Sequence, residues 1–314
     1  ATRSSQLSVE IRCSVIGQRD ESGNELSPEV ATENMISAMD QALEAIGDDA
    51  PAVSFVFLGY RGRDWKPEEV IDHARLAVEF AKKYPNRKFG FDIAGPEDTG
   101  YSPKFFSEAY EMLREYNEQI DAGLIVGERI GVTTHAGETP TFDNGRPGHE
   151  AVIEAIEMGV DRIGHGVQAV GDAETLEALK QSGKTVEICG VCNITSIPIN
   201  TKGMAIHPIQ QFLSNETPVT ICTDNDAICG TSITKEYAMF LLSGHSELMN
   251  WKNVKKVAQI GLDSSFISQA DRELATDKMK KRVRTIERMA ERAVTRIKEN
   301  SALKTGSGIL SIAT

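Results

Sequence analysis

The sequence predicts an α/β fold in which parallel strands alternate with helices and close into a (β/α)8 barrel of the TIM type. Short runs rich in apolar and β-branched residues recur along the chain, and segments with helical periodicity separate most of them. No linker, low-complexity tract or block of like charge divides the chain, so residues 1–314 are expected to form a single domain.

A third observation favours the barrel over a doubly wound open sheet. Potentially reactive side chains lie toward the ends of five different runs: Asp92, His135, His165, Glu187 and Asp224. A barrel gathers the carboxyl ends of its strands around one mouth, whereas an open sheet spreads them along a line. No glycine-rich nucleotide-binding motif of the G-x-G-x-x-G or P-loop type follows any of the runs.

Seven runs have the length and composition of buried strands. They cover residues 7–15, 52–59, 88–95, 129–135, 161–166, 184–190 and 217–224. Because a closed barrel of this type has eight strands, the chain is expected to supply one strand fewer than closure needs.

The helices are predicted from their end signals and apolar stripes. Ser27 can cap a first helix, Pro28 suits its first position, apolar residues between 30 and 46 form one stripe, and Gly47 ends it. Ser102 and Pro103 repeat the start signal. Further helical segments are expected at residues 150–158, 174–182 and, after the last strand, through the charged segment 278–300.

The composition excludes several classes of function. Asp and Glu outnumber Lys and Arg by 46 to 34, a net charge of −12, and an acidic surface repels nucleic-acid phosphates. No stretch approaches eighteen consecutive apolar residues, so no membrane span is expected. Five scattered cysteines do not make a disulfide framework. Sparse cysteines suit the cytoplasm and a start at Ala1 suits a processed, secreted protein, so localisation stays open, as does an oligomer.

The residues best suited to chemistry lie where predicted strands end. His135 and Glu138 occur in HAGE, His165 in RIGHG and Asp224 in CTDND. Imidazoles and carboxylates are ligands for zinc, and catalytic zinc lowers the pKa of bound water to about 7. A nearby glutamate can transfer protons, and a second histidine can orient the water. Taken singly, His165 also fits a structural histidine and Asp224 a helix or turn cap, but their combination indicates a metal-dependent hydrolytic site.

The other histidines lie in helical or loop contexts and are expected to be surface or capping residues: His73, His149, His207 and His245. Cys189 and Cys192 form a C-x-x-C pair, which can indicate redox chemistry. A thioredoxin-like site opens a helix just after the pair, whereas the residues that follow here predict a poor helix start. We therefore expect Cys189 to pack inside the barrel and keep a redox protein as an alternative.

The motifs VTTHAGE, DRIGHG, EIC and TDND, in this order and at this spacing, resemble the adenosine/AMP deaminase family. FGFDIAGPE from Phe89 resembles the fourth-strand segment of that family, and HPIQQFL with VTICTDND resembles its approach to the eighth strand. The resemblance runs from about Val9 to the final helices. It implies zinc-dependent hydrolytic deamination of a purine nucleoside or nucleotide, which converts adenosine or AMP to inosine or IMP and releases ammonia.

The resemblance also implies roles for single residues. His135 and Asp224 would be zinc ligands. Glu138 would protonate N1 of the purine, and His165 would act on the attacking water. The other known class of zinc deaminases uses H-x-E with P-C-x-x-C, which does not fit this chain.

Residues expected to bind substrate lie in three segments. Asp92 and Gly95 belong to the fourth-strand segment, and Gly95 would offer its backbone N–H to the purine ring. Asn225 stands where the family usually has a second aspartate, and its amide can donate to the purine N7. Arg61 and Arg63 follow the run 52–59, where a guanidinium could hold a phosphate through paired hydrogen bonds. The alternative is that both arginines belong to a solvated loop.

One family feature has no counterpart here. The family begins with a strand ending in H-x-H, which supplies two zinc ligands, and no two histidines of this chain have that spacing. We expect the chain to hold strands 2–8 and to be the larger, C-terminal piece of a split or cleaved enzyme, with strand 1 and H-x-H on a separate N-terminal chain. The rival hypothesis is a catalytically inactive relative that acts as a binding or signalling protein.

Overall fold

All seven predicted strands are present in the structure, a computed structural model that describes residues 6–195, 207–242 and 250–309, with residues 298–309 described by their backbone alone. They form one parallel sheet in the order β1-β2-β3-β4-β7-β8-β9. Their bounds are Ser8–Cys13, Ala52–Tyr60, Phe89–Ala94, Gly131–Ala136, Arg162–His165, Thr185–Ile188 and Val219–Ile221. A separate two-stranded sheet pairs β5 (Thr141–Phe142) with β6 (Arg146–Pro147).

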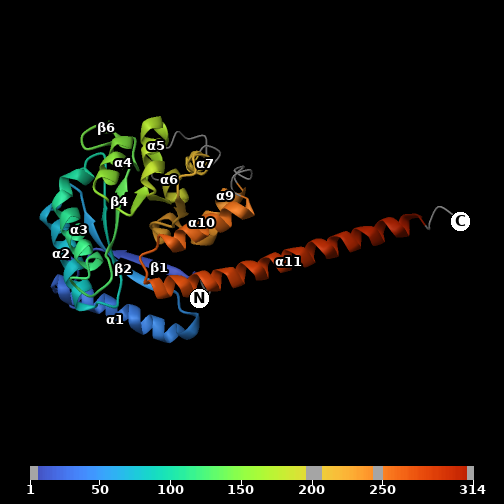
Figure 1. The fold of residues 1–314 in the computed structure, drawn as a ribbon, viewed down its shortest axis with the longest axis horizontal. Helices are drawn as coiled ribbons and strands as arrows, with labels where there is room; N and C mark the ends of the chain where they lie inside the picture. The colour runs from blue at the N-terminus through green and yellow to red at the C-terminus, as the bar shows by residue number, and fades with distance from the viewer. Residues whose placement is uncertain (1–5, 196–206, 243–249, 310–314) are drawn as a thin grey trace.

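Helices connect successive strands and lie on the outside of the sheet, as α1 to α4 do in Figure 1. The α-helices are α1 (Pro28–Ile46), α2 (Glu68–Lys83), α3 (Ser107–Asp121), α4 (Gly148–Glu157), α5 (Ala173–Ser182), α6 (Gly190–Thr195), α7 (Ile209–Ser214), α8 (Asp226–Cys229), α9 (Ile233–Leu242), α10 (Trp251–Asp263) and α11 (Gln269–Ile309). Short 3-10 helices are η1 (Gly47–Asp49), η2 (Pro103–Phe106) and η3 (Val167–Gly171).

The end signals of α1 work as the sequence predicts. The Ser27 hydroxyl accepts a hydrogen bond from the backbone N–H of Val30, and Pro28 occupies the first turn. Gly47 follows with φ of 73°, a left-handed conformation that a glycine adopts without strain. These local signals fix the boundaries of the helix before any tertiary contact is made.

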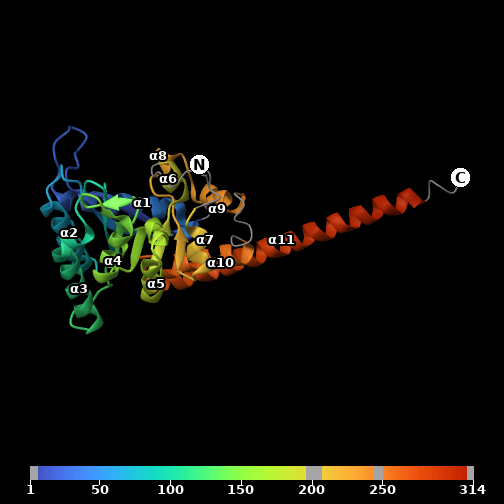
Figure 2. The same ribbon diagram turned by 90° about the horizontal axis from the view of Figure 1, so that it is seen from above.

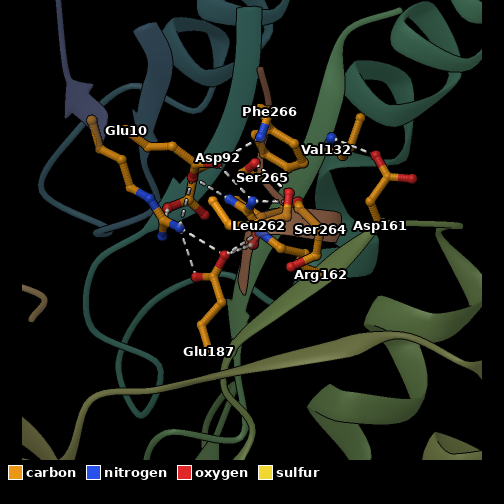
Figure 3. A network of polar contacts seen from close by, with 12 residues as sticks. Glu10, Asp92, Val132, Asp161, Arg162, Glu187, Leu262, Ser264, Ser265 and Phe266 are labelled. Carbon is orange, nitrogen blue, oxygen red and sulfur yellow. Dashed lines mark hydrogen bonds and ion pairs between the residues drawn. The ribbon is translucent and has the colours of Figure 1, made fainter. Parts of the chain in front are cut away.

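Ion pairs between distant strands require the sheet to be strongly curled. Arg12 on β1 donates to both carboxylate oxygens of Glu187 on β8 at 2.7 Å, although four strands lie between β1 and β8 in the sheet order. In a flat sheet neighbouring strands are about 4.8 Å apart, so these two residues would be separated by more than about 20 Å. Figure 3 shows Asp92, Arg162 and Glu187 converging on this interior cluster.

Arg162 on β7 makes a second cross-sheet link. Its Nε donates to Glu187 Oε1 at 2.6 Å, and its Nη1 donates to Glu10 Oε1 on β1 at 2.8 Å. The side chains of Arg162 and Glu187 are buried, so each charge depends on its partners for solvation. The interior of the curled sheet is therefore held by alternating charges as well as by apolar packing.

Phe266, which precedes α11, fills the space beside this cluster. Its ring lies under the Arg162 guanidinium at 3.6 Å, and its backbone N–H donates to Glu10 Oε1 at 2.7 Å. The ring also packs against β3 and β4, where a Cβ at Gly90 or Gly131 would lie 2.5 or 2.1 Å from it. Only glycine fits at these two strand positions.

The barrel is seven-stranded within the described residues. There, β1 pairs with β2 and β9 pairs with β8, and no ladder joins β1 to β9. This arrangement confirms the predicted (β/α)8-type architecture with one strand fewer than closure needs. Every described helix falls short of the length or apolar character that a membrane span requires.

Two expectations about local structure are wrong. His73, expected at the surface, is buried on α2, where its Nε2 accepts from Val15 N at 3.3 Å and its Nδ1 lies 2.6 Å from Glu69 O. His207, also expected to be a surface or capping residue, is buried, and its Nδ1 accepts from the backbone N–H of Ile209 at 3.1 Å.

The helix α6 begins at Gly190, between the two cysteines, and not in the segment after Cys192 where a poor helix start was predicted. His149 is half-buried, and His245 lies outside the described residues.

The last helix is much longer than the predicted segment 278–300. It runs from Gln269 to Ile309, and Figures 1 and 2 both show its outer part projecting away from the barrel as a single rod. Beyond residue 287 all of its side chains that the structure describes are exposed.

We predict that Arg162→Met lowers the free energy of unfolding by about 3–5 kcal/mol, because three interior carboxylates then face a single guanidinium. Urea denaturation followed by circular dichroism measures the loss. The control is Arg114→Met, whose exposed guanidinium lies 3.9 Å from Glu118 and should cost less than about 1 kcal/mol. Equal losses from the two substitutions would contradict the stabilising role of the interior cluster.

Candidate active site

His135, at the carboxyl end of β4, is held by a buried carboxylate. Its Nδ1 lies 3.2 Å from Asp92 Oδ1, and the other oxygen of Asp92 accepts from Arg12 at 2.9 Å. Burial acts to lower the pKa of His135, but Asp92 outweighs it and raises the pKa to about 9. Burial would raise the pKa of Asp92, but His135 and Arg12 hold it well below its ordinary value. With Nδ1 engaged, Nε2 is the ring atom left to bind a metal, which is the usual arrangement of a metal-binding histidine.

His165 and Glu138 lie beside His135. The ladder between β4 and β7 sets Ala136 opposite His165, and the two imidazole ring centres are 5.0 Å apart. The His165 Nε2 lies 3.6 Å from Glu138 Oε1. His165 has φ of 60°, an unusual conformation for a residue with a side chain, which turns the chain sharply as β7 ends.

The electrostatics of these two groups favour their neutral forms. Burial, together with the neighbouring His135, lowers the pKa of His165 well below its ordinary value. Burial raises the pKa of Glu138, partly offset by His135. Asp224 acts on both groups in the direction that raises their pKa values. A raised pKa makes a carboxyl group better suited to donate a proton at a pH closer to neutral.

The side chain of Glu97 anchors the loop that carries Glu138. One oxygen of Glu97 accepts from the backbone N–H of Glu138 at 2.7 Å and of Thr139 at 2.9 Å. The other oxygen lies 3.3 Å from Arg61 Nη2, and both side chains are fully buried. Arg61 Nη2 and this Glu97 oxygen do not have the geometry of a hydrogen bond, so the attraction between the two side chains is mainly that of opposite charges.

This burial changes the interpretation of Arg61. Its guanidinium faces Glu97, and its Nε donates to Gly95 O at 3.2 Å. A side chain buried in this way neither belongs to a solvated loop nor is accessible to a phosphate group. Arg63 has a 40% exposed side chain that pairs with Asp143 at 3.0 Å and lies over the Tyr101 ring, so it remains available to a ligand.

Gly95 lies just past β3, where the chain turns with φ of 112°. A Cβ there would lie 2.8 Å from the Tyr60 ring, so the position requires glycine. Asp92 lies earlier on β3, and both of its carboxylate oxygens contact protein groups, His135 and Arg12. That favours a role in orienting His135 over direct contact with a substrate.

Asp224 and Asn225 follow β9 on an exposed turn. Asp224 has φ of 53°, and Asn225 precedes α8 without a capping hydrogen bond from its side chain. Within the described part of the chain, no group of three His, Cys, Asp or Glu side chains is arranged to hold a metal ion. Ligation of one ion by both His135 and Asp224 therefore stays a prediction.

The cysteine pair does not have the character of a redox site. Cys189 and Cys192 are both free and buried. Burial raises the pKa of the Cys189 thiol well above its ordinary value, whereas a redox cysteine has a lowered pKa. Cys189 packs in the interior, as expected.

Several residues around the site escaped sequence reasoning: Glu10, Arg12, Glu97, Arg162 and Asn193. Glu10 and Arg12 alternate with apolar residues in β1, and Arg162 occupies the corresponding kind of position in β7. Every second residue of a barrel strand points to the barrel interior. The alternation of these charged residues with apolar ones could therefore have identified them as interior residues. No local signal identifies their partners.

A curled parallel sheet with imidazoles and carboxylates gathered at its strand ends defines the class as a parallel α/β barrel with its candidate site at the carboxyl ends of the strands. Residues 4–282 match the family model "Adenosine deaminase", and the chain belongs to that family. The outer part of α11 lies beyond the matched residues.

Curated relatives of the same family align with part of this chain. It is 29% identical over 206 residues to an adenosine deaminase of Clostridium kluyveri, which covers 65% of this chain and 52% of the relative. It is 30% identical over 190 residues to an adenosine deaminase of Serratia proteamaculans, covering 60% and 50%. The chain thus spans about half the length of these curated relatives.

Solved structures share the fold. The N6-mAMP deaminase of Arabidopsis superposes with a TM-score of 0.65 at 19% identity, covering 88% of this chain and 73% of the other. An amidohydrolase from Burkholderia ambifaria with bound zinc gives 0.67 at 16% identity, covering 90% and 70%. At these identities the likeness supports the barrel architecture alone.

Proposed function

We propose that this protein takes part in the zinc-dependent hydrolytic deamination of a purine nucleoside or nucleotide, adenosine or AMP. The observation that carries the proposal is the grouping of His135, His165 and Glu138 at the ends of two paired strands, in a chain of the adenosine deaminase family. In the reaction the oxygen of water bonds to C6 of the purine, the bond from C6 to the exocyclic nitrogen breaks, and ammonia leaves.

Each of the following residues has its own role in the proposed reaction. Glu138, whose pKa is raised by burial, donates a proton to the purine N1. His165 orients the attacking water, and the backbone of Gly95 with the amide of Asn225 positions the purine ring. Arg63 is the candidate contact for the phosphate of a nucleotide substrate.

The chemistry of the donors fits a zinc ion. His135 offers Nε2 with its ring oriented by a carboxylate, and Asp224 offers an oxygen. Such an ion, when bound, supplies a Lewis acid that activates water at neutral pH. Because a catalytic zinc usually has at least three protein ligands, the remaining donors are assigned to an H-x-H segment from outside residues 1–314.

Glu138→Gln is predicted to reduce turnover of adenosine or AMP by about 10²- to 10⁴-fold, because glutamine cannot transfer the proton. Zinc content should be unchanged, since Glu138 binds no metal in the proposal. Steady-state kinetics with metal analysis test this. The control is Glu157→Gln, at an exposed carboxylate paired with Lys104. An inactive relative would show no difference between the two variants.

Arg63→Ala is predicted to weaken use of AMP by roughly tenfold to a hundredfold in kcat/KM while sparing adenosine, because a charge-assisted hydrogen bond to phosphate is lost. Arg75→Ala, at an exposed ion pair on α2, is the control. An equal loss on both substrates, or no loss on either, would remove the phosphate role.

Native mass spectrometry with metal quantitation is predicted to find little zinc on residues 1–314 expressed alone and one zinc ion when an H-x-H segment from outside these residues is present. The reason is that two ligands hold zinc poorly. One zinc ion per chain on residues 1–314 alone would contradict the assignment of the remaining ligands.

A further inference from the structure

An apolar stripe runs along α11 and continues past the barrel. At helical periodicity one side of the helix carries these residues: Ala275, Met279, Val283, Ile286, Met289, Ala290, Ala293, Val294 and Ile297. Near the barrel, where α11 packs against α10, Ala275 is buried and Met279 and Val283 are half-buried. The outer residues of the same stripe therefore extend a face that is already used for packing.

The outer part of this stripe is exposed to solvent. The side chains of Ile286, Met289, Val294 and Ile297 belong to residues that are between 50% and 65% exposed. Figures 1 and 2 show this part of α11 projecting from the barrel in two perpendicular views. A contiguous apolar face on the surface of a protein usually marks an interaction site.

The remaining sides of this helix segment are strongly basic. Residues 278–297 contain eight Lys or Arg residues and only two Glu residues, in a chain whose net charge is −12. One of the two acids, Glu287, already accepts hydrogen bonds from Lys255 and Trp251 of α10. The acidity of the whole chain thus conceals a local excess of positive charge beside the stripe.

We propose that the outer part of α11, residues 286–297, docks onto an anionic lipid surface. The apolar stripe enters the boundary between head groups and acyl chains, and the basic side chains beside it pair with the negative groups of the lipids. The helix lies along the surface and does not cross it. This inference goes beyond the proposed deamination and does not depend on it.

Charge favours a lipid surface over a second copy of the same helix. Two copies of α11 packed along their stripes would bring two basic segments together, and like charges at that distance repel. A surface that contains phosphatidylserine has the opposite sign, and each Lys or Arg near it adds to the attraction.

The centre of the stripe favours a lipid surface over a protein groove. Ala290 and Ala293 lie there, and side chains this small cannot fill the pockets through which a groove usually holds a helix. A lipid surface requires only an apolar face flanked by cations. A nucleic acid would engage the cations and leave the apolar stripe in water.

Flotation of the 314-residue chain with vesicles tests the proposal. Vesicles of phosphatidylcholine alone are compared with vesicles that contain phosphatidylserine at about 30% of the lipid, in about 0.1 M and about 1 M salt. We expect binding to the phosphatidylserine vesicles to be at least about tenfold stronger, and to fall in the higher salt. Amide hydrogen exchange of the bound protein should slow at residues 286–297 and stay unchanged in β3.

Two double variants separate the charged and apolar contributions. Arg288→Glu with Arg292→Glu should weaken binding to the phosphatidylserine vesicles by roughly tenfold or more, because two cations become anions. Ile286→Ser with Ile297→Ser should weaken binding by about tenfold at unchanged charge, because less apolar surface leaves water.

The matched control is Arg75→Glu with Arg114→Glu, which reverses the same number of exposed charges on α2 and α3. It should leave vesicle binding unchanged. Turnover of adenosine or AMP should be the same in all three double variants, since none of these residues belongs to the candidate active site. The lipid proposal and the proposed function can therefore fail separately.

Equal binding to both kinds of vesicle, binding to neither, or a control that loses as much as the arginine variant would overturn the proposal. If the vesicles are not bound, two further measurements identify the true occupant. A dimer in sedimentation velocity that Ile286→Ser with Ile297→Ser abolishes would assign the stripe to a second copy. Binding to duplex DNA that the same variant leaves intact would assign the cations to nucleic acid.

Discussion

The contact on which the structure most depends is the meeting of Arg12 with Glu187 and Asp92 inside the curled sheet. It links the side chain of Arg12 on β1 to that of Glu187 on β8 across the interior, a contact that only a curled sheet with gathered strand ends allows. Burying charges in this way costs solvation energy that is recovered only when every charge is paired with good geometry. Arg162 and Glu10 complete that pairing. The same Asp92 orients His135, so the curvature of the sheet and the geometry of the candidate metal ligand depend on one carboxylate.

The candidate catalytic groups share a second common feature. Each is held by a buried polar residue from a different element: His135 by Asp92, the Glu138 loop by Glu97, and His165 by Asn193. A side chain whose own rotamer is fixed in this way loses little entropy when a substrate arrives. The site therefore lies on rigid strand ends, and its precision comes from residues that do not themselves meet the substrate.

Local patterns predicted the seven strands, the ends of α1 and the strand-end positions of His135, His165 and Asp224, because alternation, capping and turn chemistry are written in adjacent residues. Contacts between distant residues were not predictable in the same way. Nothing near Arg61 indicates that Glu97 will bury it, and nothing near His73 or His207 indicates that each will accept a backbone N–H in the core.

The unpaired edges of the sheet and the proposed zinc site lie at the same part of the barrel. Within the described residues the sheet ends at β9 on one side and β1 on the other, and β9 leads directly to Asp224. A strand inserted between them would pair with both edges, removing the unpaired backbone groups that make edges prone to aggregation. Because the strands are parallel, its carboxyl end would emerge beside Asp224 at the mouth, on the side of the barrel facing His135. One strand-forming segment can therefore both close the sheet and supply the further ligands of the proposed zinc site, which is the physical reason to seek both in a single segment.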